Sequence, residues 1–177
     1  MTVGHPATRL HHHAYVVRDQ EATRHFYEDV LGMPLVATWC EVENVRGKER
    51  TYCHTFFELG DGSALAFFQF VDPDDEAELI LDTGTSLNHV ALNSTQQQQD
   101  HVRAQLEDAG LAHRTIDHGY CVSLDVSDPD GLTVEFTVDA DDAEAIDRWQ
   151  RSVAHDELRR WLAGDHTPNN HARGGVS

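Results

Sequence analysis

The stretch HHAYVVRD, at residues 12–19, decides the fold because its pattern returns later in the chain as HVAL, at residues 89–92. Each copy sets a histidine before a short apolar run that is typical of a β-strand. A helix-like stretch then follows in both copies and ends at a glycine, Gly32 in the first and Gly110 in the second. An internal repeat of this kind predicts two copies of one structural unit that meet around a shared site.

The first copy predicts one strand, one helix and three further strands. Asp19 is a good helix N-cap after the opening strand, and apolar residues recur at helical spacing up to Gly32. Gly60-Asp61-Gly62 is typical of a tight turn between the last two strands. The strands are expected at 10–17, 35–42, 51–59 and 64–71, with a polar loop between the second and the third.

The second copy repeats this order. A strand at 86–92 precedes Ser94 and Gln97, which match a capping box at the start of a helix. Two or three strands follow that helix. Asp128-Pro129-Asp130-Gly131 is a strong turn signal between the last two, which are expected at 120–126 and 132–138.

These patterns predict an α+β fold, in which two paired βαβββ modules form a curved mixed sheet around a cavity and a C-terminal helix follows. The expected boundaries are 8–72 for the first module, 73–85 for a linker, 86–139 for the second module, 140–163 for a helical extension and 164–177 for a disordered tail.

The helical extension carries an amphipathic stripe between about Ala143 and Ala163. Such a helix can dock on its own domain, form a dimer contact or cover a site as a lid, and docking is the commonest of these uses. The apolar residues of the stripe are Ile146, Trp149, Val153, Trp161 and Leu162.

The chain is strongly acidic. Its 31 Asp and Glu against 13 Lys and Arg give a formal net charge of -18 over 177 residues. Such a surface repels phosphate backbones and anionic membranes, so binding to nucleic acid or to a membrane surface is not expected. No apolar run approaches the roughly 18 residues of a membrane-spanning helix, and the N-terminus lacks a signal-peptide core. We expect a cytoplasmic protein that acts on a small molecule.

The three cysteines, Cys40, Cys53 and Cys121, form neither a C-x-x-C motif nor an even set for a disulfide framework. This use of cysteine is typical of a reducing compartment. Cys53 and Cys121 are expected to be small buried apolar residues.

Two histidines at equivalent strand positions could bind a metal ion if a third ligand lay near them. In the last strand Glu135 alternates with Val134 and Phe136, and a carboxylate inside an apolar strand is costly unless a charge or a donor meets it. His12, His89 and Glu135 would match the 2-His-1-carboxylate arrangement, which leaves coordination positions open for substrate or oxygen. The residues alone equally allow a solvated Glu135 and two ordinary strand histidines.

Residues 12–19, Phe26-Tyr27 and Leu31-Gly32 resemble the opening of the vicinal-oxygen-chelate superfamily. This superfamily includes glyoxalases, extradiol dioxygenases, epimerases and proteins of bleomycin or fosfomycin resistance. The second module is similar to it through Asn88-His89-Val90-Ala91 and through the turn at 128–131 that leads to the last strand.

The resemblance extends over about residues 10–138. It implies that His12, His89 and Glu135 hold a divalent metal ion, for which Fe(II) is favoured and Mn, Zn, Ni or Co is possible. His11 and His13 would lie on the other face of the opening strand. The resemblance specifies the fold and the ligand positions more closely than the reaction.

A fourth ligand is missing where part of the superfamily has one. Glyoxalases and epimerases place a glutamate or glutamine on the fourth strand of the first module. Counted from the turn at 60–62, this chain has Ala66 there, which cannot bind a metal. Gln69 has the opposite strand phase and would need a β-bulge to point inward. The absence of a fourth ligand disfavours glyoxalase-type chemistry and favours the three-ligand site of extradiol dioxygenases and some resistance transferases.

Three further residues occupy positions that the resemblance makes candidates for catalysis. His54, on the third strand, and His118 fall near active-site histidines of extradiol dioxygenases, where an imidazole could exchange protons near neutral pH. Asp125 stands where those enzymes have a tyrosine, and it could act as a base, bind a substrate donor or face solvent. His54 could equally be a hydrogen-bonded strand residue, and His118 an exposed loop residue.

Three functions follow as alternatives. The favoured one is an Fe(II) extradiol-type dioxygenase that acts on a catechol-like, bidentate oxygen substrate. The second is a redox-neutral, metal-dependent lyase, isomerase or thiol transferase of the glyoxalase type. The third is a metal-free binding protein similar to bleomycin-resistance proteins. Because members with two modules per chain commonly dimerise, a homodimer is expected.

Overall fold

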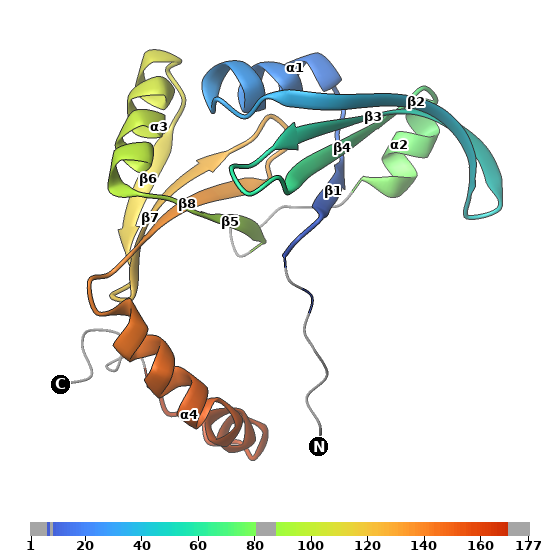
Figure 1. Cartoon of the computed structure of the whole chain (residues 1–177). Helices are drawn as coiled ribbons and strands as arrows, with labels where there is room; N and C mark the ends of the chain where they lie inside the picture. The colour runs from blue at the N-terminus through green and yellow to red at the C-terminus, as the bar shows by residue number, and fades with distance from the viewer. Residues whose placement is uncertain (1–6, 8, 81–87, 170–177) are drawn as a thin grey trace. The chain divides into compact units, whose positions relative to one another are not determined.

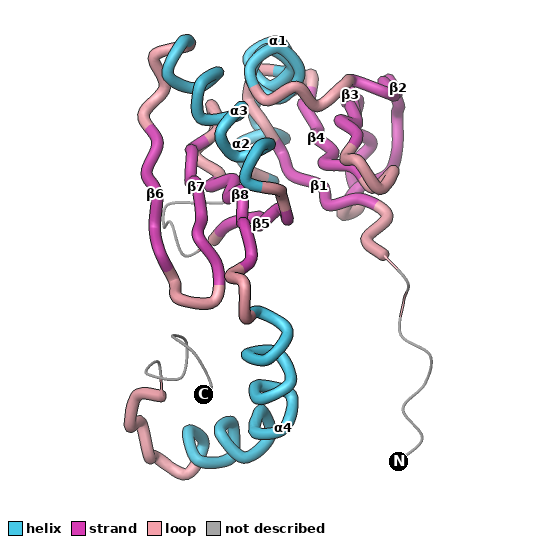
Figure 2. Tube along the Cα trace, turned by 60° about the vertical axis from the view of Figure 1, so that its left-hand side comes forward, coloured by secondary structure: helices cyan, strands magenta, loops and turns pink. Residues whose placement is uncertain are grey.

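The computed structural model describes residue 7 and residues 9–80 and 88–169, which form two compact units. The first unit contains the chain up to Asn88 together with 108–110 and 127–132, and the second contains 89–107, 111–126 and the chain from Thr133. Each unit is built on one mixed β-sheet (Figures 1 and 2). The predictions for residues 8, 81–87 and 170–177, which include parts of the linker and of the tail, lie outside the described residues.

In the described part of the first unit, the sheet has four strands in the order β1-β4-β3-β2. β1 (His12–Val16) is parallel to β4 (Ala64–Phe70), whereas β3 (Lys48–Glu58) is antiparallel to both β4 and β2 (Leu35–Val45). The two-residue turn Arg46-Gly47 joins β2 to β3 with φ angles of 54° and 83°, the positive values that a tight hairpin requires. This hairpin replaces the polar loop that was predicted there.

The sheet of the second unit has the same order, β5-β8-β7-β6, in the described residues. β5 is parallel to β8, as β1 is to β4, and β6 is antiparallel to β7. The predicted repeat is therefore confirmed, and in each module the histidine-bearing strand pairs with the last strand. The bounds of these strands are His89–Asn93 for β5, His113–Asp117 for β6, Cys121–Ser127 for β7 and Thr133–Asp139 for β8.

The helix of the first module starts at the predicted N-cap. Oδ1 of Asp19 accepts hydrogen bonds from the backbone N–H groups of Glu21 and Ala22. α1 (Gln20–Arg24) then continues into the π-helical segment η1 (His25–Val30). Asp19 thereby satisfies N–H groups that have no partner inside the helix.

The helix of the second module, α3 (Gln96–Asp108), is capped one residue later than predicted. The backbone N–H of Gln98 donates to Oγ1 of Thr95 (3.2 Å), and the N–H of Thr95 donates to Oε1 of Gln98 (2.9 Å). Ser94, which was predicted to form this capping box with Gln97, instead donates from its backbone N–H to the carbonyl oxygen of Thr137 in β8 (2.8 Å). Ser94 therefore still belongs to the pairing of β5 with β8.

A glutamine ties each helix to its sheet in the same way. Gln20 at the start of α1 and Gln99 in α3 each donate from Nε2 to carbonyl oxygens of the last two strands of their module. The acceptors are Phe67 (2.8 Å) and Cys53 (3.4 Å) for Gln20, and Phe136 (2.8 Å) and Val122 (3.0 Å) for Gln99. The two glutamines are equivalent parts of the repeat that the sequence pattern did not reveal.

Replacing Gln99 by leucine is expected to lower the free energy of unfolding by about 2 kcal/mol, because two buried carbonyl oxygens lose their donor while the side-chain volume is nearly kept. Denaturation by urea measures the change. The matched control is Gln97→Leu on the exposed side of the same helix, which should shift the free energy by less than about 0.5 kcal/mol. Equal stabilities of the two variants would contradict a tethering role for Gln99.

The segment predicted as a linker contains a helix, α2 (Pro73–Leu79). Its Asp75 is buried, and Oδ1 lies 2.5 Å from Nζ of Lys48 and 3.3 Å from Nη1 of Arg50, both in β3. This acidic segment was predicted only as a linker, and the basic residues that neutralise Asp75 come from a strand more than twenty positions earlier in the chain. α2 is thus held to the first sheet by ion pairs.

The turn at 128–131 forms as predicted and belongs to the first unit. Oδ1 of Asp128 accepts hydrogen bonds from the backbone N–H groups of Asp130 (2.9 Å) and Leu132 (2.8 Å). Oδ2 of the same carboxylate accepts a hydrogen bond from the hydroxyl of Tyr27 (3.1 Å), and both residues are buried. Asp128 therefore closes the turn and connects it to the core beside η1.

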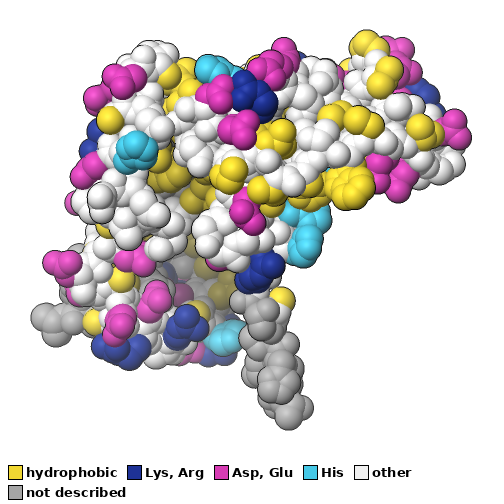
Figure 3. Space-filling view, turned by 45° about the horizontal axis from the view of Figure 1, so that its top comes forward, with side chains coloured by type: hydrophobic (Ala, Val, Ile, Leu, Met, Phe, Trp, Pro, Cys, Tyr) yellow, Lys and Arg dark blue, Asp and Glu magenta, His cyan; other side chains and the backbone are white. Residues whose placement is uncertain are grey.

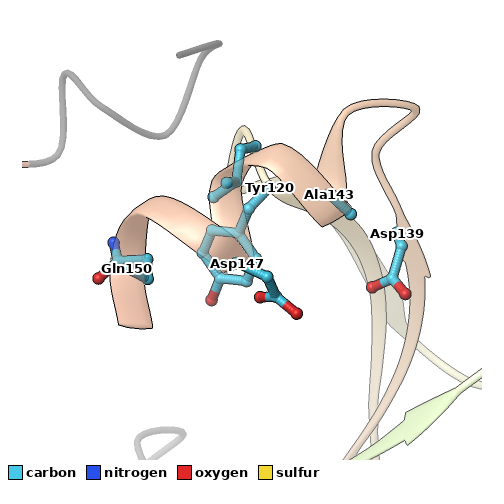
Figure 4. A pocket seen from close by; sticks show the side chains of 6 residues that line it. Tyr120, Asp139, Ala143, Asp147 and Gln150 are labelled. Atoms are coloured by element: carbon cyan, nitrogen blue, oxygen red, sulfur yellow. The ribbon is translucent and has the colours of Figure 1, made fainter. Parts of the chain in front are cut away.

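α4 (Ala143–Leu162) is the predicted C-terminal helix. It follows β8 and extends beyond the end of the second sheet (Figures 1 and 2). Ile146 is buried near its start, where a pocket of about 240 Å³ lies between the first turns of α4 and Tyr120 (Figure 4). Trp161 and Leu162 at its end are exposed, so only the first part of the predicted apolar stripe is docked within the described chain.

The acidic side chains are spread over the face shown in Figure 3 and do not gather in one patch. The chain as a whole carries a formal net charge of -18. In the part of the chain that the structure describes, no helix has both the length and the apolar character needed to cross a membrane.

Candidate metal centre

β5 and β8 bring two of the three predicted ligands together. His89 pairs with Thr133, and Ala91 pairs with Glu135, so the His89 and Glu135 side chains leave the same face of the sheet. Nε2 of His89 lies 3.2 Å from Oε2 of Glu135. Glu135 is only 8% exposed, whereas Val134 and Phe136 occupy the core on the other face. The solvated glutamate that the pattern allowed is therefore not what the structure contains.

His118 approaches the same carboxylate from the turn between β6 and β7. Its Nε2 lies 3.8 Å from Oε1 of Glu135 and 3.2 Å from Oγ of Ser123. The backbone N–H of His118 donates to the carbonyl oxygen of Cys121, which fixes the turn. Glu135 thus has His89 near one carboxylate oxygen and His118 near the other. His118 is half-buried, so it is not the exposed loop residue that the pattern allowed.

Asp125 is buried and paired, so the solvent-facing alternative for this residue is wrong. Arg114 lies directly opposite on β6, and its Nε and Nη2 are 3.0 Å and 2.9 Å from Oδ2 of Asp125. Oδ1 of Asp125 is buried with no hydrogen-bond partner among the described residues. Because Asp125 follows Ser123 by two positions on β7, the pair with Arg114 lies on the same sheet face as Glu135. Sequence reasoning missed Arg114, because β6 was not delimited.

In the first unit, His12 and His54 lie on one face of the sheet with two aromatic rings. His54 stacks on Phe68 with ring centroids 3.6 Å apart, and its centroid lies 4.3 Å from that of Phe56. The His12 ring is 6.3 Å from His54 and 5.4 Å from Phe56. The two histidines that were predicted as ligand and catalytic residue are therefore neighbours against an apolar wall.

The histidines beside His12 are placed differently. His13 stacks on Tyr15 with ring centroids 4.5 Å apart, and Tyr15 continues to Phe67 on the helix-covered face of the sheet. Nδ1 of His11, which precedes β1, lies 2.7 Å from Nδ1 of His12. The strand phase that separates His12 from His13 is therefore as predicted.

His54 is held neutral at pH 7. Burial, followed by the effect of nearby His12, lowers the pKa of His54 to about 4. Its Nε2 is buried and has no hydrogen-bond partner among the described residues. His54 is therefore not the fully hydrogen-bonded strand residue that the pattern allowed.

The unfolding free energy of the chain is expected to fall when the pH is lowered from 6.5 towards 4, because the unfolded state binds a proton at His54 that the folded state excludes. Between pH 7 and pH 5 this effect is expected to amount to about 2 kcal/mol. Urea denaturation of wild type and His54→Gln across this range measures it as a difference in slope. His101→Gln, which removes an exposed histidine, should keep the wild-type slope. A His54→Gln slope equal to that of wild type would contradict the prediction.

The position of a fourth ligand is occupied by alanine. Ala66 pairs with Ala14, two residues after His12, just as Glu135 pairs with Ala91, two residues after His89. Ala66 is therefore the residue of the first module that corresponds to Glu135.

Gln69 lies on the face opposite to His12. The pairing of β3 with β4 runs without a bulge from Tyr52–Phe70 to Glu58–Ala64. Oε1 of Gln69 accepts a hydrogen bond from the backbone N–H of Gln20 (3.1 Å), and its Nε2 donates to the carbonyl oxygen of Arg18 (2.9 Å). Both polar atoms of Gln69 thus hold the connection between β1 and α1.

Among the described residues, no group of three or more His, Cys, Asp or Glu side chains stands close enough to share a metal ion. His89 and Glu135 belong to the second unit and His12 to the first. The three-ligand set of His12, His89 and Glu135 stays a prediction, of which the structure contains the His89–Glu135 pair.

The chain belongs to the Glyoxalase/Bleomycin resistance protein/Dioxygenase superfamily, whose family model matches residues 9–136. A search of curated proteins finds no match. Superfamily membership agrees with the mixed sheets, the repeated strand order and the histidine at the start of each module.

Solved structures of this superfamily share the fold. A glyoxylase/bleomycin resistance protein/dioxygenase domain from Frankia sp. EAN1pec is 15% identical with a TM-score of 0.60, over 77% of this chain and 95% of that one. A lactoylglutathione lyase from Agrobacterium tumefaciens is 19% identical with a TM-score of 0.53, over 76% and 96%. The fosfomycin resistance protein FosX from Listeria monocytogenes, complexed with Mn(II) and sulfate, is 14% identical with a TM-score of 0.56, over 79% and 99%.

Proposed function

We propose that this chain is a divalent-metal enzyme in which His12, His89 and Glu135 are the metal ligands, and that it is an Fe(II) extradiol-type dioxygenase for a catechol-like substrate. The observation that carries the proposal is the pair of His89 and Glu135, with Nε2 and Oε2 3.2 Å apart. This pair joins the first and the last strand of the second module, as the predicted ligand set requires.

The residues fit a divalent metal by their chemistry. Burial of the Glu135 carboxylate is costly unless a cation or a donor compensates it, and the nearest groups are imidazoles, which are ordinary ligands of Fe, Mn, Zn and Ni. Two imidazoles and one carboxylate form a set that leaves positions open. Because Ala66 contributes no ligand, this set is smaller than that of a four-ligand site.

A bound divalent metal would supply Lewis acidity and, as Fe(II), electron density for the reaction of oxygen with a chelated substrate. The protein residues have separate roles in the proposal. His118, next to Glu135 and Ser123, would hold or return a proton of the substrate hydroxyl. Phe56 and Phe68 would exclude water from one side of the substrate ring, and neutral His54 between them would accept a hydrogen bond from a substrate hydroxyl.

A second candidate function is a redox-neutral metal enzyme, and Asp125 is the observation that favours it. Oδ2 of Asp125 is neutralised by Arg114, while Oδ1 is buried and has no partner among the described residues. A carboxylate held in this way could move a proton of a substrate that a Mn, Zn, Ni or Co ion polarises.

Metal analysis after purification without oxygen tests these alternatives, together with oxygen uptake in the presence of a panel of catechols. We expect near-stoichiometric iron and oxygen consumption coupled to a ring-cleaved product. Stoichiometric Mn, Zn, Ni or Co without oxygen uptake would move the function to the redox-neutral class. If no metal bound even after reconstitution, a metal-free binding protein would remain.

Two neighbouring histidines provide matched variants for this experiment. His12→Ala should lose the metal, whereas His13→Ala, on the helix-covered face, should retain it. Equal metal contents would contradict the assignment of His12.

We further propose a homodimer, which light scattering after size-exclusion chromatography tests.

A further inference from the structure

Cys40 and Cys53 lie directly opposite each other on β2 and β3. They are thirteen positions apart in the sequence, but the turn Arg46-Gly47 lies midway between them, so the hairpin makes them a cross-strand pair. Directly opposed residues of antiparallel strands project from the same face of the sheet. These two cysteines, which form no motif in the sequence, are therefore neighbours in the sheet.

The backbone around Cys53 indicates that Cys40 and Cys53 form a non-hydrogen-bonded pair, in which opposed residues lie closer together than in a hydrogen-bonded pair. The carbonyl oxygen of Thr51 accepts a hydrogen bond from the N–H of Val71, so the peptide groups of Thr51 point away from β2. The direction of the peptide groups alternates along a strand with a period of two residues. The peptide groups of Cys53, two positions after Thr51, therefore also point away from β2. In such non-hydrogen-bonded pairs the Cα atoms lie about 4.5 Å apart, within the range of roughly 4.4–6.8 Å that a disulfide spans.

The two thiols differ in their surroundings. Cys40 is exposed, Cys53 is half-buried, and both are reduced in the structure. Burial, followed by the nearby Cys40, raises the pKa of the Cys53 thiol. Because the thiolate is the reactive form, Cys53 is the weaker nucleophile towards a dissolved oxidant, and Cys40 is the accessible one.

We propose that Cys40 and Cys53 form an oxidation site, in which hydrogen peroxide converts the two thiols into a disulfide across the β2–β3 hairpin. This inference is independent of the proposed function. It rests on the pairing of two strands within the first unit and on the exposure of Cys40.

The chemistry needs one peroxide molecule and two steps. The Cys40 thiolate attacks one oxygen of the peroxide, the O–O bond breaks, hydroxide leaves and Cys40 becomes a sulfenic acid. The Cys53 sulfur then attacks the Cys40 sulfur, the S–S bond forms and the S–O bond breaks. The departing hydroxide takes the proton of Cys53, so two thiols and one peroxide yield one disulfide and two water molecules. The sulfurs together lose two electrons, which the peroxide accepts.

The test is a titration of the reduced full-length chain with hydrogen peroxide, followed by alkylation of free thiols and peptide mapping without reductant. We expect an intramolecular Cys40–Cys53 peptide, a mass loss of two hydrogen atoms and full reversal by dithiothreitol. Catalase added before the peroxide should prevent the change. Free thiols at both positions after a peroxide excess, sulfinic acid at Cys40 without a cross-link, or cross-links between chains only would each overturn the proposal.

Single variants separate the roles of the two residues. Cys53→Ser should stop the reaction at a sulfenic acid on Cys40, which a dimedone probe captures, and Cys40→Ser should leave Cys53 reduced. The matched control is Cys121→Ser, because Cys121 is buried in β7, and this variant should form the same cross-link as wild type. Loss of the cross-link in Cys121→Ser would overturn the assignment of the pair.

Discussion

Glu135→Gln is expected to weaken the binding of a divalent metal by more than about 100-fold, since even the hydrogen-bonded partners of metal ligands contribute 10- to 100-fold. Glu135 is the anionic member of the proposed ligand set, and an amide of the same shape cannot neutralise the charge of the ion. The His89 imidazole, whose Nε2 lies 3.2 Å from Oε2 of Glu135, would also lose its anionic partner. Calorimetric titration of the apo protein with Fe(II) or Mn(II) under nitrogen measures the affinity.

His118→Gln provides the matched control, because His118 approaches the other oxygen of the same carboxylate at 3.8 Å. This variant should bind metal as wild type does and lose about 100-fold in turnover, the contribution typical of a proton-transferring side chain. If Glu135→Gln bound metal as tightly as wild type, the ligand assignment would be wrong. If His118→Gln lost the metal, His118 would be a ligand and not a proton carrier.

Asp128→Ala is expected to lower the free energy of unfolding by about 3 kcal/mol. The substitution removes the acceptor of three hydrogen bonds, and it leaves the hydroxyl of Tyr27 and the backbone N–H of Leu132 without partners in a buried place. Because the same carboxylate closes the turn at 128–131, the loss includes the local structure of that turn. Thermal and urea denaturation measure the change.

Two milder variants distinguish the parts of this effect. Asp128→Asn keeps one acceptor oxygen for the turn and should cost about 1 kcal/mol, and Tyr27→Phe, which removes only the hydroxyl, should cost a similar amount. A loss as large in Asp128→Asn as in Asp128→Ala would show that the negative charge matters more than the hydrogen-bond acceptor. Asp128→Ala with wild-type stability would contradict the proposed role of the turn.

The strand phases could be predicted from the sequence because they depend on local alternation. Counting along the strands predicted the correct sheet face for His12, Ala66 and Glu135. It succeeded because β4 and β8 run without a bulge beside their parallel partners. The turns at 60–62 and 128–131 were readable for the same reason, because their residue types specify the backbone conformation. In a strand, alternation with a period of two determines the sheet face of each residue, and this does not depend on which other segments pack against the strand.

Contacts between strands were harder to predict, because they depend on register. The pairing of Arg114 with Asp125 requires the limits of β6, and that of Cys40 with Cys53 requires the two-residue turn at 46–47. The ion pairs of Asp75 show the same difficulty, because the acidic composition of the predicted linker does not reveal its basic partners in β3.

The correspondence between Ala66 and Glu135 has a consequence for the history of the chain. In the genetic code every alanine codon differs from a codon for an acidic residue by one base. A single nucleotide change at codon 66 could therefore give both halves of the duplication an acidic side chain at this position, and the reverse change removes it from one half. With His12, His89 and Glu135 as the proposed ligands, one base change would add a fourth candidate ligand without any rearrangement of the sheet. Under the proposed ligand set, codon 66 is thus the position at which one base change would alter the number of carboxylates beside the metal.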